Sequence, residues 1–366
     1  MKNKRFLIIL MLITHSVFAQ LYPHERIMHA AGAESLVYFQ SADKTKPMII
    51  FIPGDGHLAR IFYGYPQGNP ADFLNYWIHK KGYPFLALSY PSDNQVFNRI
   101  YPAFTISQWG EQIAAIAKKI IDENKLTNKI IIAGWSMGGA VEQTVSQAAQ
   151  KQGLEIELFI GLSAVPPLPY VMQSGAFDVN TKRINNLADR SKLFPLCFEM
   201  LTEQSKDNGH AIVSYDIYRS QFTGNIPAAL AAEGYWFKQG QIRKNIPLVI
   251  EDSGIFDFAT TPWIALIVDD SPTTAKISLI DPYAWSFLRA EMINKNYLQK
   301  IEPSKLAPAQ WQQLRTLVNN LPDYLKITVH GNHFFFVGEK GAKATADAIE
   351  TLSGRVRAVK QQLEKL

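Results

Sequence analysis

Six short apolar runs constrain the fold of this chain more than any other feature of its sequence. Most of them are apolar at every position and do not alternate with polar residues. Such continuous runs are typical of strands that lie buried between two layers of helices, as in a largely parallel sheet. The runs are residues 48–52, 84–88, 129–133, 156–160, 263–268 and 325–329.

Helical patterns stand between or after these runs. From residue 105 to residue 124, Trp109, Ile113, Ile116 and Ile120 recur at the spacing of one helix face, and a similar apolar stripe runs from Ile349 to Leu363. Strands that alternate with helices predict an α/β fold, with a mostly parallel central sheet and helices on both faces. The final helix is expected to pack against the last strand.

One long segment, about 166–246, does not follow this alternation. It is rich in aromatic residues, proline and polar residues, which predicts a cap inserted into the α/β domain. Two interpretations of its aromatic residues stay open: they line an apolar acyl or aryl pocket, or they pack in the cap's own small core. These residues are Tyr170, Phe177, Phe194, Tyr215, Tyr218, Phe222, Tyr235, Trp236 and Phe237.

The amino terminus has the pattern of a secretory signal peptide. Lys2, Lys4 and Arg5 precede a short apolar run, and Ala19 ends a stretch suited to cleavage. The run is shorter than the roughly 20 apolar residues that cross a membrane. We therefore expect residues 1–19 to be removed, leaving a periplasmic or secreted protein, residues 20–366, without a membrane anchor.

Charge and cysteine content narrow the classes of function. Removing three cationic residues with the signal lowers the formal net charge from +5 to +2, and the mature chain has no clustered basic face of the kind that binds nucleic acid. Cys197 is the only cysteine, so no intrachain disulfide framework can form. With 47% hydrophobic residues, the chain has the material for a large core.

The sequence around Ser136 combines a reactive residue type with a characteristic turn. The segment Gly134-Trp135-Ser136-Met137-Gly138 follows the apolar run 129–133 directly and precedes a helical pattern. A serine on such a strand-to-helix turn projects from the sheet edge, and the amide of the next residue, Met137, faces the same space. The pattern predicts a nucleophilic serine with half of an oxyanion hole beside it.

With this motif the sequence resembles the α/β-hydrolase superfamily, and the resemblance covers most of the mature chain. The segment 52–57, Ile-Pro-Gly-Asp-Gly-His, resembles the family's oxyanion loop. Gly331-Asn332-His333, after the last apolar run, resembles its histidine loop. The resemblance implies a Ser–acid–His triad in that chain order, with Ser136 as nucleophile and His333 as base.

The assignments of the base and of the acid each have alternatives. His330 also follows the last run and is the alternative base. The resemblance places the acid after the next-to-last strand, which favours Asp270, with Asp269, Asp257 and Asp281 as alternatives; Asp257 would require residues 246–250 to form a strand. The long distance from each of these to His333 predicts an additional helical insertion, about 281–319.

The second oxyanion donor is expected to be a backbone amide of the loop 54–56, at Asp55. Because a carboxylate next to a developing oxyanion would repel it, the Asp55 side chain should turn outward or pair with Arg60 or His57.

Together these features predict an exported serine hydrolase that cleaves an ester-type bond of a small acyl substrate through an acyl-enzyme on Ser136. This chemistry needs no cofactor and no metal. Two alternatives use the same scaffold: a binding protein that has lost catalysis, and an acyltransferase in which an alcohol replaces water.

Overall fold

The computed structural model describes residues 21–168, 183–231 and 233–365 of the chain. The predicted signal peptide and part of the predicted cap, including Tyr170 and Phe177, lie outside the described residues. In the part that is described, no helix is both long and apolar enough to span a membrane.

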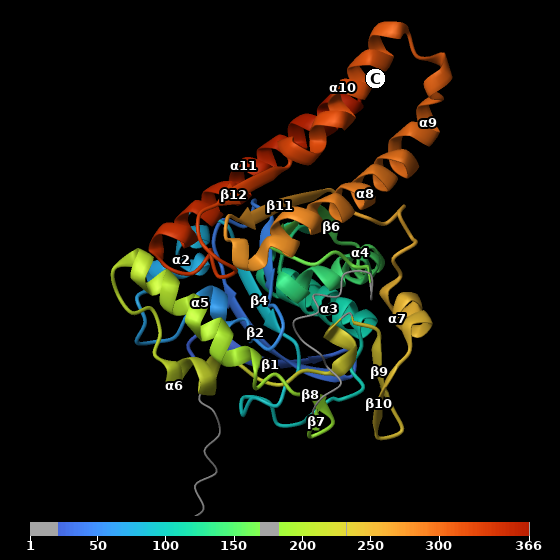
Figure 1. Ribbon diagram of the computed structural model, residues 1–366. Coiled ribbons are helices and arrows are strands. Elements are labelled where there is room, and N and C mark those ends of the chain that lie inside the picture. Colours follow the sequence, from blue (N-terminus) through green and yellow to red (C-terminus); the bar gives the residue numbers. More distant parts are fainter. Residues whose placement is uncertain (1–20, 169–182, 232, 366) are drawn as a thin grey trace, which may run out of the picture.

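The centre of the molecule is an eight-stranded sheet in the order β1-β2-β4-β3-β5-β6-β11-β12 (Figure 1). All neighbouring strands from β4 to β12 are parallel. The six predicted runs are confirmed as the six parallel strands: β3 (Met48–Ile52), β4 (Phe85–Ser89), β5 (Lys129–Trp135), β6 (Glu155–Leu162), β11 (Ile264–Asp269) and β12 (Lys326–Val329).

The sequence did not predict the first two strands, β1 (Glu25–Ala30) and β2 (Ala33–Gln40). They form an antiparallel hairpin, and β2 pairs antiparallel with β4. Polar residues such as Arg26, His29 and Glu34 interrupt the apolar pattern here. Because β1 is the edge strand and has one neighbour, it tolerates Arg26 and His29.

Each face of the sheet is covered by its own helices. Ile49 and Phe51 of β3 pack in one core with residues of α2 (Leu74–Lys80) and α11 (Glu339–Leu363). Met48 and Ile50 pack in the other core with α3 (Ile106–Asn124) and α4 (Glu142–Lys151). Successive side chains of a strand point to opposite faces, so a run buried on both sides must be apolar throughout. The predicted fold class is therefore confirmed.

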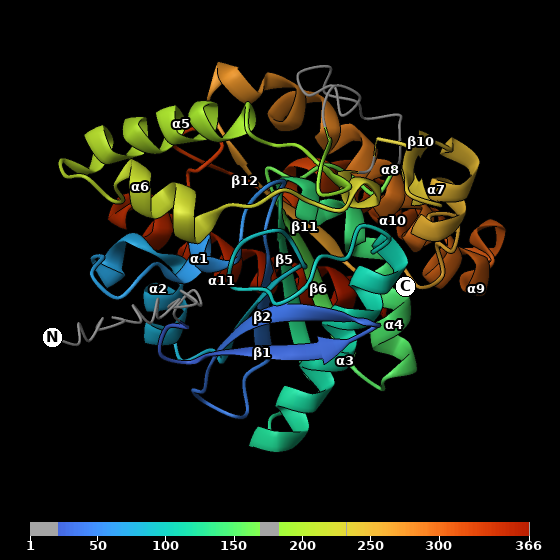
Figure 2. The ribbon, with the colours of Figure 1, turned by 90° about the horizontal axis from the view of Figure 1, so that it is seen from below.

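The described part of the cap segment contains short elements. These are β7 (Arg183–Ile184), β8 (Leu187–Ala188), α5 (Leu193–Asn208), α6 (Tyr215–Ile217), β9 (Tyr235–Lys238) and β10 (Gln241–Lys244), followed by α7 (Ile246–Ser253). In Figure 2, α5 and α6 lie together at one edge of the molecule. The alternative strand at residues 246–250 is wrong, because Asn245 caps Leu248 N–H and Pro247 occupies the first helical turn of α7.

Between β11 and β12 the chain forms a helical arm. It contains α8 (Asp281–Ile293), α9 (Gln299–Ile301) and α10 (Pro308–Tyr324), and it projects from the body of the molecule together with the end of α11 (Figure 1). The additional helical insertion predicted at about 281–319 is therefore confirmed.

Candidate active site

Ser136 lies at the point where β5 ends and a short helical turn leads into α4. Its φ of 52° is in the left-handed region, which costs a non-glycine residue about 1–3 kcal/mol and is typical of functional turns. A Cβ atom on Gly134 would come within 2.4 Å of Gly138 O, and one on Gly138 within 2.7 Å of Ile52 O. The tight turn thus requires both glycines of the motif.

The loop after β3 packs directly against Ser136. A Cβ atom on Gly54 would lie 2.8 Å from Ser136 Cβ, so only glycine allows this approach. Parallel strands end at the same edge of a sheet, which is why the loop after β3 and the turn after β5 meet. The position of this loop agrees with the oxyanion role that the sequence suggested for Asp55 N–H.

The side chain of Asp55 does not pair with either partner expected from the sequence. Its carboxylate accepts a hydrogen bond of 2.7 Å from Arg190 Nε, which belongs to the cap. Arg60 is buried and instead donates 2.8 and 2.7 Å hydrogen bonds to Glu25. His57 donates from Nδ1 to the Asp55 backbone oxygen at 2.7 Å. The Asp55 carboxylate therefore faces the cap, and the positive charge of Arg190 compensates its negative charge.

His333 lies in the loop after β12 and lines the same cavity as Ser136. Its backbone oxygen accepts a 2.9 Å hydrogen bond from Trp135 Nε1, which ties the histidine loop to the residue before the serine. Burial lowers the pKa of His333 to about 4, and the charge of Asp269 opposes this shift. The imidazole is thus neutral near pH 7, the form that can accept a proton.

Asp270 pairs with the other histidine. Its carboxylate, 45% exposed, accepts a 2.9 Å hydrogen bond from Nδ1 of His330, which is 84% exposed. It also accepts from Gly331 N–H at 3.0 Å. The expected contact between Asp270 and His333 is not formed, because Asp270 is the first residue beyond β11 and its side chain points to solvent.

Asp269, the last residue of β11, is the carboxylate whose charge acts on His333. It is 2% exposed, and its Oδ2 accepts a 2.7 Å hydrogen bond from Ser163 Oγ. Its Oδ1 accepts from Ser271 N–H and from Thr274 Oγ1, at 3.1 and 2.5 Å. His333 Nδ1 is buried without a hydrogen-bond partner among the described residues. No hydrogen bond therefore joins this nitrogen to Asp269, which acts on the imidazole through its charge.

The two remaining candidate acids have partners elsewhere. Asp257 accepts a hydrogen bond from Gln147 Nε2 on α4 at 3.3 Å. Asp281, the first residue of α8, pairs with Lys276 at 3.0 Å. Of the four aspartates considered from the sequence, Asp269 is the one whose charge raises the pKa of His333.

Ser136 and His333 open onto a cavity of about 470 Å³. One wall is a face of α5, and the others come from the segment after β6, from Ala231 and Glu233, and from residues 273–277. The apolar lining consists of Trp135, Met137, Val165, Pro166, Leu168, Leu193, Leu196, Cys197, Met200, Ala231 and Ile277.

None of the described cap aromatic residues is among those that line the cavity. Phe194, Tyr218 and Phe222 are buried in the large core that also contains Ile49 and Phe51 of β3, so they form no separate small core of the cap. The aromatic rings at the cavity are those of His57, Trp135 and His333, which follow or end strands of the sheet.

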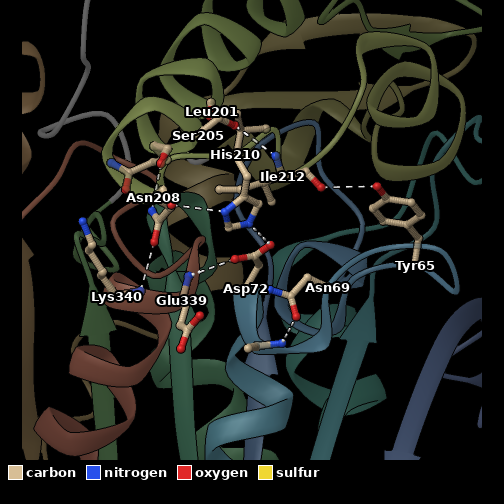
Figure 3. A network of polar contacts seen from close by, with 12 residues as sticks. Tyr65, Asn69, Asp72, Leu201, Ser205, Asn208, His210, Ile212, Glu339 and Lys340 are labelled. Carbon is tan, nitrogen blue, oxygen red and sulfur yellow. Dashed lines mark hydrogen bonds and ion pairs between the residues drawn. The ribbon is translucent and has the colours of Figure 1, made fainter.

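A polar network away from the cavity joins the cap to the last helix (Figure 3). The buried carboxylate of Asp72 accepts hydrogen bonds from His210 Nε2 at 2.7 Å and from Glu339 N–H at 3.1 Å. Asn208, at the end of α5, accepts from Lys340 N–H at 3.1 Å. The network therefore holds the end of the cavity-lining helix against the start of α11.

Sequence reasoning missed several residues that shape the site. His57 was considered only as a partner for Asp55 and Tyr218 only as one of the cap's aromatic residues, while Tyr90 and Arg190 were not assigned a role at the site. Tyr90 lies two residues after the predicted strand 84–88, which is a usable signal, whereas Arg190 and Tyr218 reach the site from a cap whose path the sequence does not reveal.

The sequence matches no protein-family model and no curated protein. Solved structures do resemble the chain. A carboxylesterase of Nitrososphaera gargenis is 13% identical with a TM-score of 0.47, over 92% of this chain and 99% of that one. A serine hydrolase of Cycloclasticus zankles is 12% identical with a TM-score of 0.48, over 90% and 96%. Est1E of Butyrivibrio proteoclasticus is 13% identical with a TM-score of 0.44, over 92% and 99%.

All three TM-scores lie below 0.5, so the assignment of the fold rests on the sheet and its loops and not on these likenesses. In the sheet itself the strands follow the order β1-β2-β4-β3-β5-β6-β11-β12, and the antiparallel pairs are β1–β2 and β2–β4. Its parallel strands bring the strained serine turn, the glycine loop and the histidine loop to one edge. The chain therefore has the fold of the α/β-hydrolase superfamily, as its sequence motifs predicted.

Proposed function

We propose that this protein is an exported serine hydrolase that cleaves carboxylic esters through an acyl-enzyme on Ser136. The observation that carries the proposal is the presence of a strained serine and a buried, neutral histidine on one apolar cavity. The cavity has the volume of a small-molecule site, typically about 300–1,000 Å³, and its lining suits an apolar acyl group.

In the first half of the reaction, Ser136 Oγ attacks the ester carbonyl carbon while His333 takes the hydroxyl proton. The N–H groups of Met137 and Asp55 stabilise the oxyanion that forms. The tetrahedral intermediate then expels the alcohol, which receives the proton from His333. The acyl group remains bound to Ser136.

In the second half, water attacks the acyl carbon and gives its proton to His333. The carboxylic acid leaves as Ser136 Oγ regains that proton. Each half creates a positively charged imidazolium, and we propose that Asp269, in place of Asp270, stabilises it. A buried carboxylate is suited to this role because little water screens its charge.

The proposal is tested by labelling the purified mature protein with a fluorophosphonate. Wild type and Ser191→Ala, a change of an exposed cap serine, should become labelled, and Ser136→Ala should not. A folded wild-type protein that takes up no label at Ser136 would instead be a binding protein on this scaffold. Acyl transfer to added alcohol in preference to water would identify an acyltransferase.

Export is proposed from the sequence of residues 1–19 alone. Mass spectrometry of the protein made in its own cell should find Gln20 as the first residue, in the periplasm or the medium. Protein retained in the cytoplasm with residues 1–19 still attached would contradict it.

A further inference from the structure

The loop that would supply the second oxyanion donor is a tight turn with an unusual support. His57 N–H donates to Gly54 O across the turn at 3.3 Å. A single buried hydroxyl, Tyr90 Oη, also donates to Gly54 O at 2.7 Å and accepts from His57 N–H at 3.0 Å. Tyr90 therefore bridges the two ends of the turn.

The Tyr90 side chain is itself well fixed. It follows β4 directly, is 1% exposed and meets the ring of Trp109 edge-on at 5.2 Å between centroids. Burial and the nearby charge of Asp55 raise its pKa well above the ordinary value, so the hydroxyl keeps the proton that it donates to Gly54 O.

The geometry of the peptide bond links this contact to the oxyanion site. Gly54 C=O and Asp55 N–H belong to one planar, trans peptide unit, so they point in opposite directions. A hydrogen bond that fixes the carbonyl therefore also fixes the direction of the N–H. That N–H has no hydrogen-bond partner among the described residues, and Gly54 is the residue that packs against Ser136.

The next peptide unit is held from the cap. Because a carbonyl oxygen only accepts, His57 Nδ1 must carry the hydrogen that it shares with Asp55 O at 2.7 Å. Nε2 then accepts from the hydroxyl of Tyr218 at 2.8 Å. Burial lowers the pKa of His57 to about 4, so this neutral tautomer persists near pH 7. The peptides on both sides of Asp55 are thus anchored.

We propose that Tyr90 is a positioning residue for catalysis: its hydroxyl holds the Gly54–Asp55 peptide so that Asp55 N–H is presented to the oxyanion, while Tyr218, acting through His57, holds the following peptide. The inference rests on the proposed hydrolase function. It assigns Tyr90 and Tyr218 no contact with the substrate. Their effect should therefore appear in the chemical step and not in substrate binding.

The test compares Tyr90→Phe with Tyr83→Phe, a control that lies two residues before the start of β4, whereas Tyr90 follows its end. Removing an oxyanion donor outright costs about 10²–10³ in kcat, so losing only its support should lower kcat by about 10–100-fold. KM for a short-chain ester should change by less than about twofold, because the aromatic ring and the cavity remain. The control should match wild type in both constants.

Fluorophosphonate labelling distinguishes failure of the proposed hydrolase function from failure of the inference about Tyr90. If wild type is not labelled at Ser136, the proposed function and this inference both fail. If wild type is labelled and active, a folded Tyr90→Phe protein with unchanged kcat, or with its loss confined to KM, overturns the inference alone.

Circular dichroism establishes folding of each variant. Should Tyr90→Phe not fold, Tyr218→Phe decides by the same criterion: a lower kcat at unchanged KM supports the inference, and wild-type kcat overturns it.

Discussion

Two adjacent aspartates show that a shift of one position along the chain changes the role of a residue at this site. Asp269 ends β11, is buried and acts electrostatically on His333, whereas Asp270 is exposed and pairs with His330. The sequence favoured Asp270 because it lies further into the loop. Side-chain direction alternates along a strand, so a difference of one residue exchanges the interior for solvent.

We expect Asp269→Asn to lower kcat by about 10³–10⁴-fold, because the imidazolium loses its compensating charge and the imidazole its preferred tautomer. Asp270→Asn should change kcat by no more than a few-fold. Steady-state kinetics with a chromogenic ester, together with a thermal melt to establish folding, checks both variants. The opposite order of effects would restore Asp270 as the acid.

The pH dependence of kcat/KM should reflect the burial of His333. The base acts only when neutral, so activity falls as His333 becomes protonated on acidification. Because burial lowers its pKa to about 4, in spite of the opposing charge of Asp269, activity should persist to about pH 5 and decline below that. Initial rates from pH 4 to 8 measure this, with circular dichroism at each pH. A midpoint near 6.5, the ordinary value for histidine, would mean that the imidazole is hydrated in the working enzyme.

At the scale of elements, α5 is the helix on which the cavity depends. One face lines the cavity, while its C-terminal end is fastened through Asn208 and His210 to Asp72 and to the start of α11 (Figure 3). The two parts of the helix therefore have separable roles: one shapes the binding space, and the other anchors the helix.

The anchoring contact should make stability depend on pH. The hydrogen bond to Asp72 raises the pKa of folded His210 above the ordinary 6.5. Its contribution is thus complete below pH 6.5 and is lost as pH rises through the raised value. His210→Gln should lower Tm by about 1–3 °C at pH 6, since the pair is partly exposed, and by less at pH 9. His79→Gln is the control. An equal decrease at both pH values would show that the charge of His210 contributes nothing.

The cavity-lining face should determine which acyl groups are accepted. Met200→Trp would fill part of the 470 Å³ cavity, so kcat/KM for octanoate esters should fall at least about tenfold more than for acetate esters. Thr202→Trp, at an exposed position on the same helix, should leave the ratio unchanged. Rates for a series of p-nitrophenyl esters give the answer. A parallel loss for all chain lengths would place the acyl group elsewhere.

For the molecule as a whole, the sequence predicted what depends on local pattern. Strands buried on both faces are continuously apolar, so all six parallel strands were recognisable, and the strained turn at Ser136 has a local glycine pattern. The β1–β2 hairpin was missed because its strands contain polar residues. Contacts such as those of Arg190 and Tyr218 with the loop at Asp55 join residues more than 130 positions apart, and no local pattern encodes them.

The helical arm leaves the sheet at β11 and returns to it at β12, and these two strands are direct neighbours. The arm is thus a long insertion whose two ends lie close together in the sheet. The entropic cost of bringing the ends of such an insertion together grows only slowly with its length. Because Trp285 anchors α8 to Ala164 beside the sheet, we expect insertions or deletions beyond α8, around α9, to leave Asp269 and His333 in place.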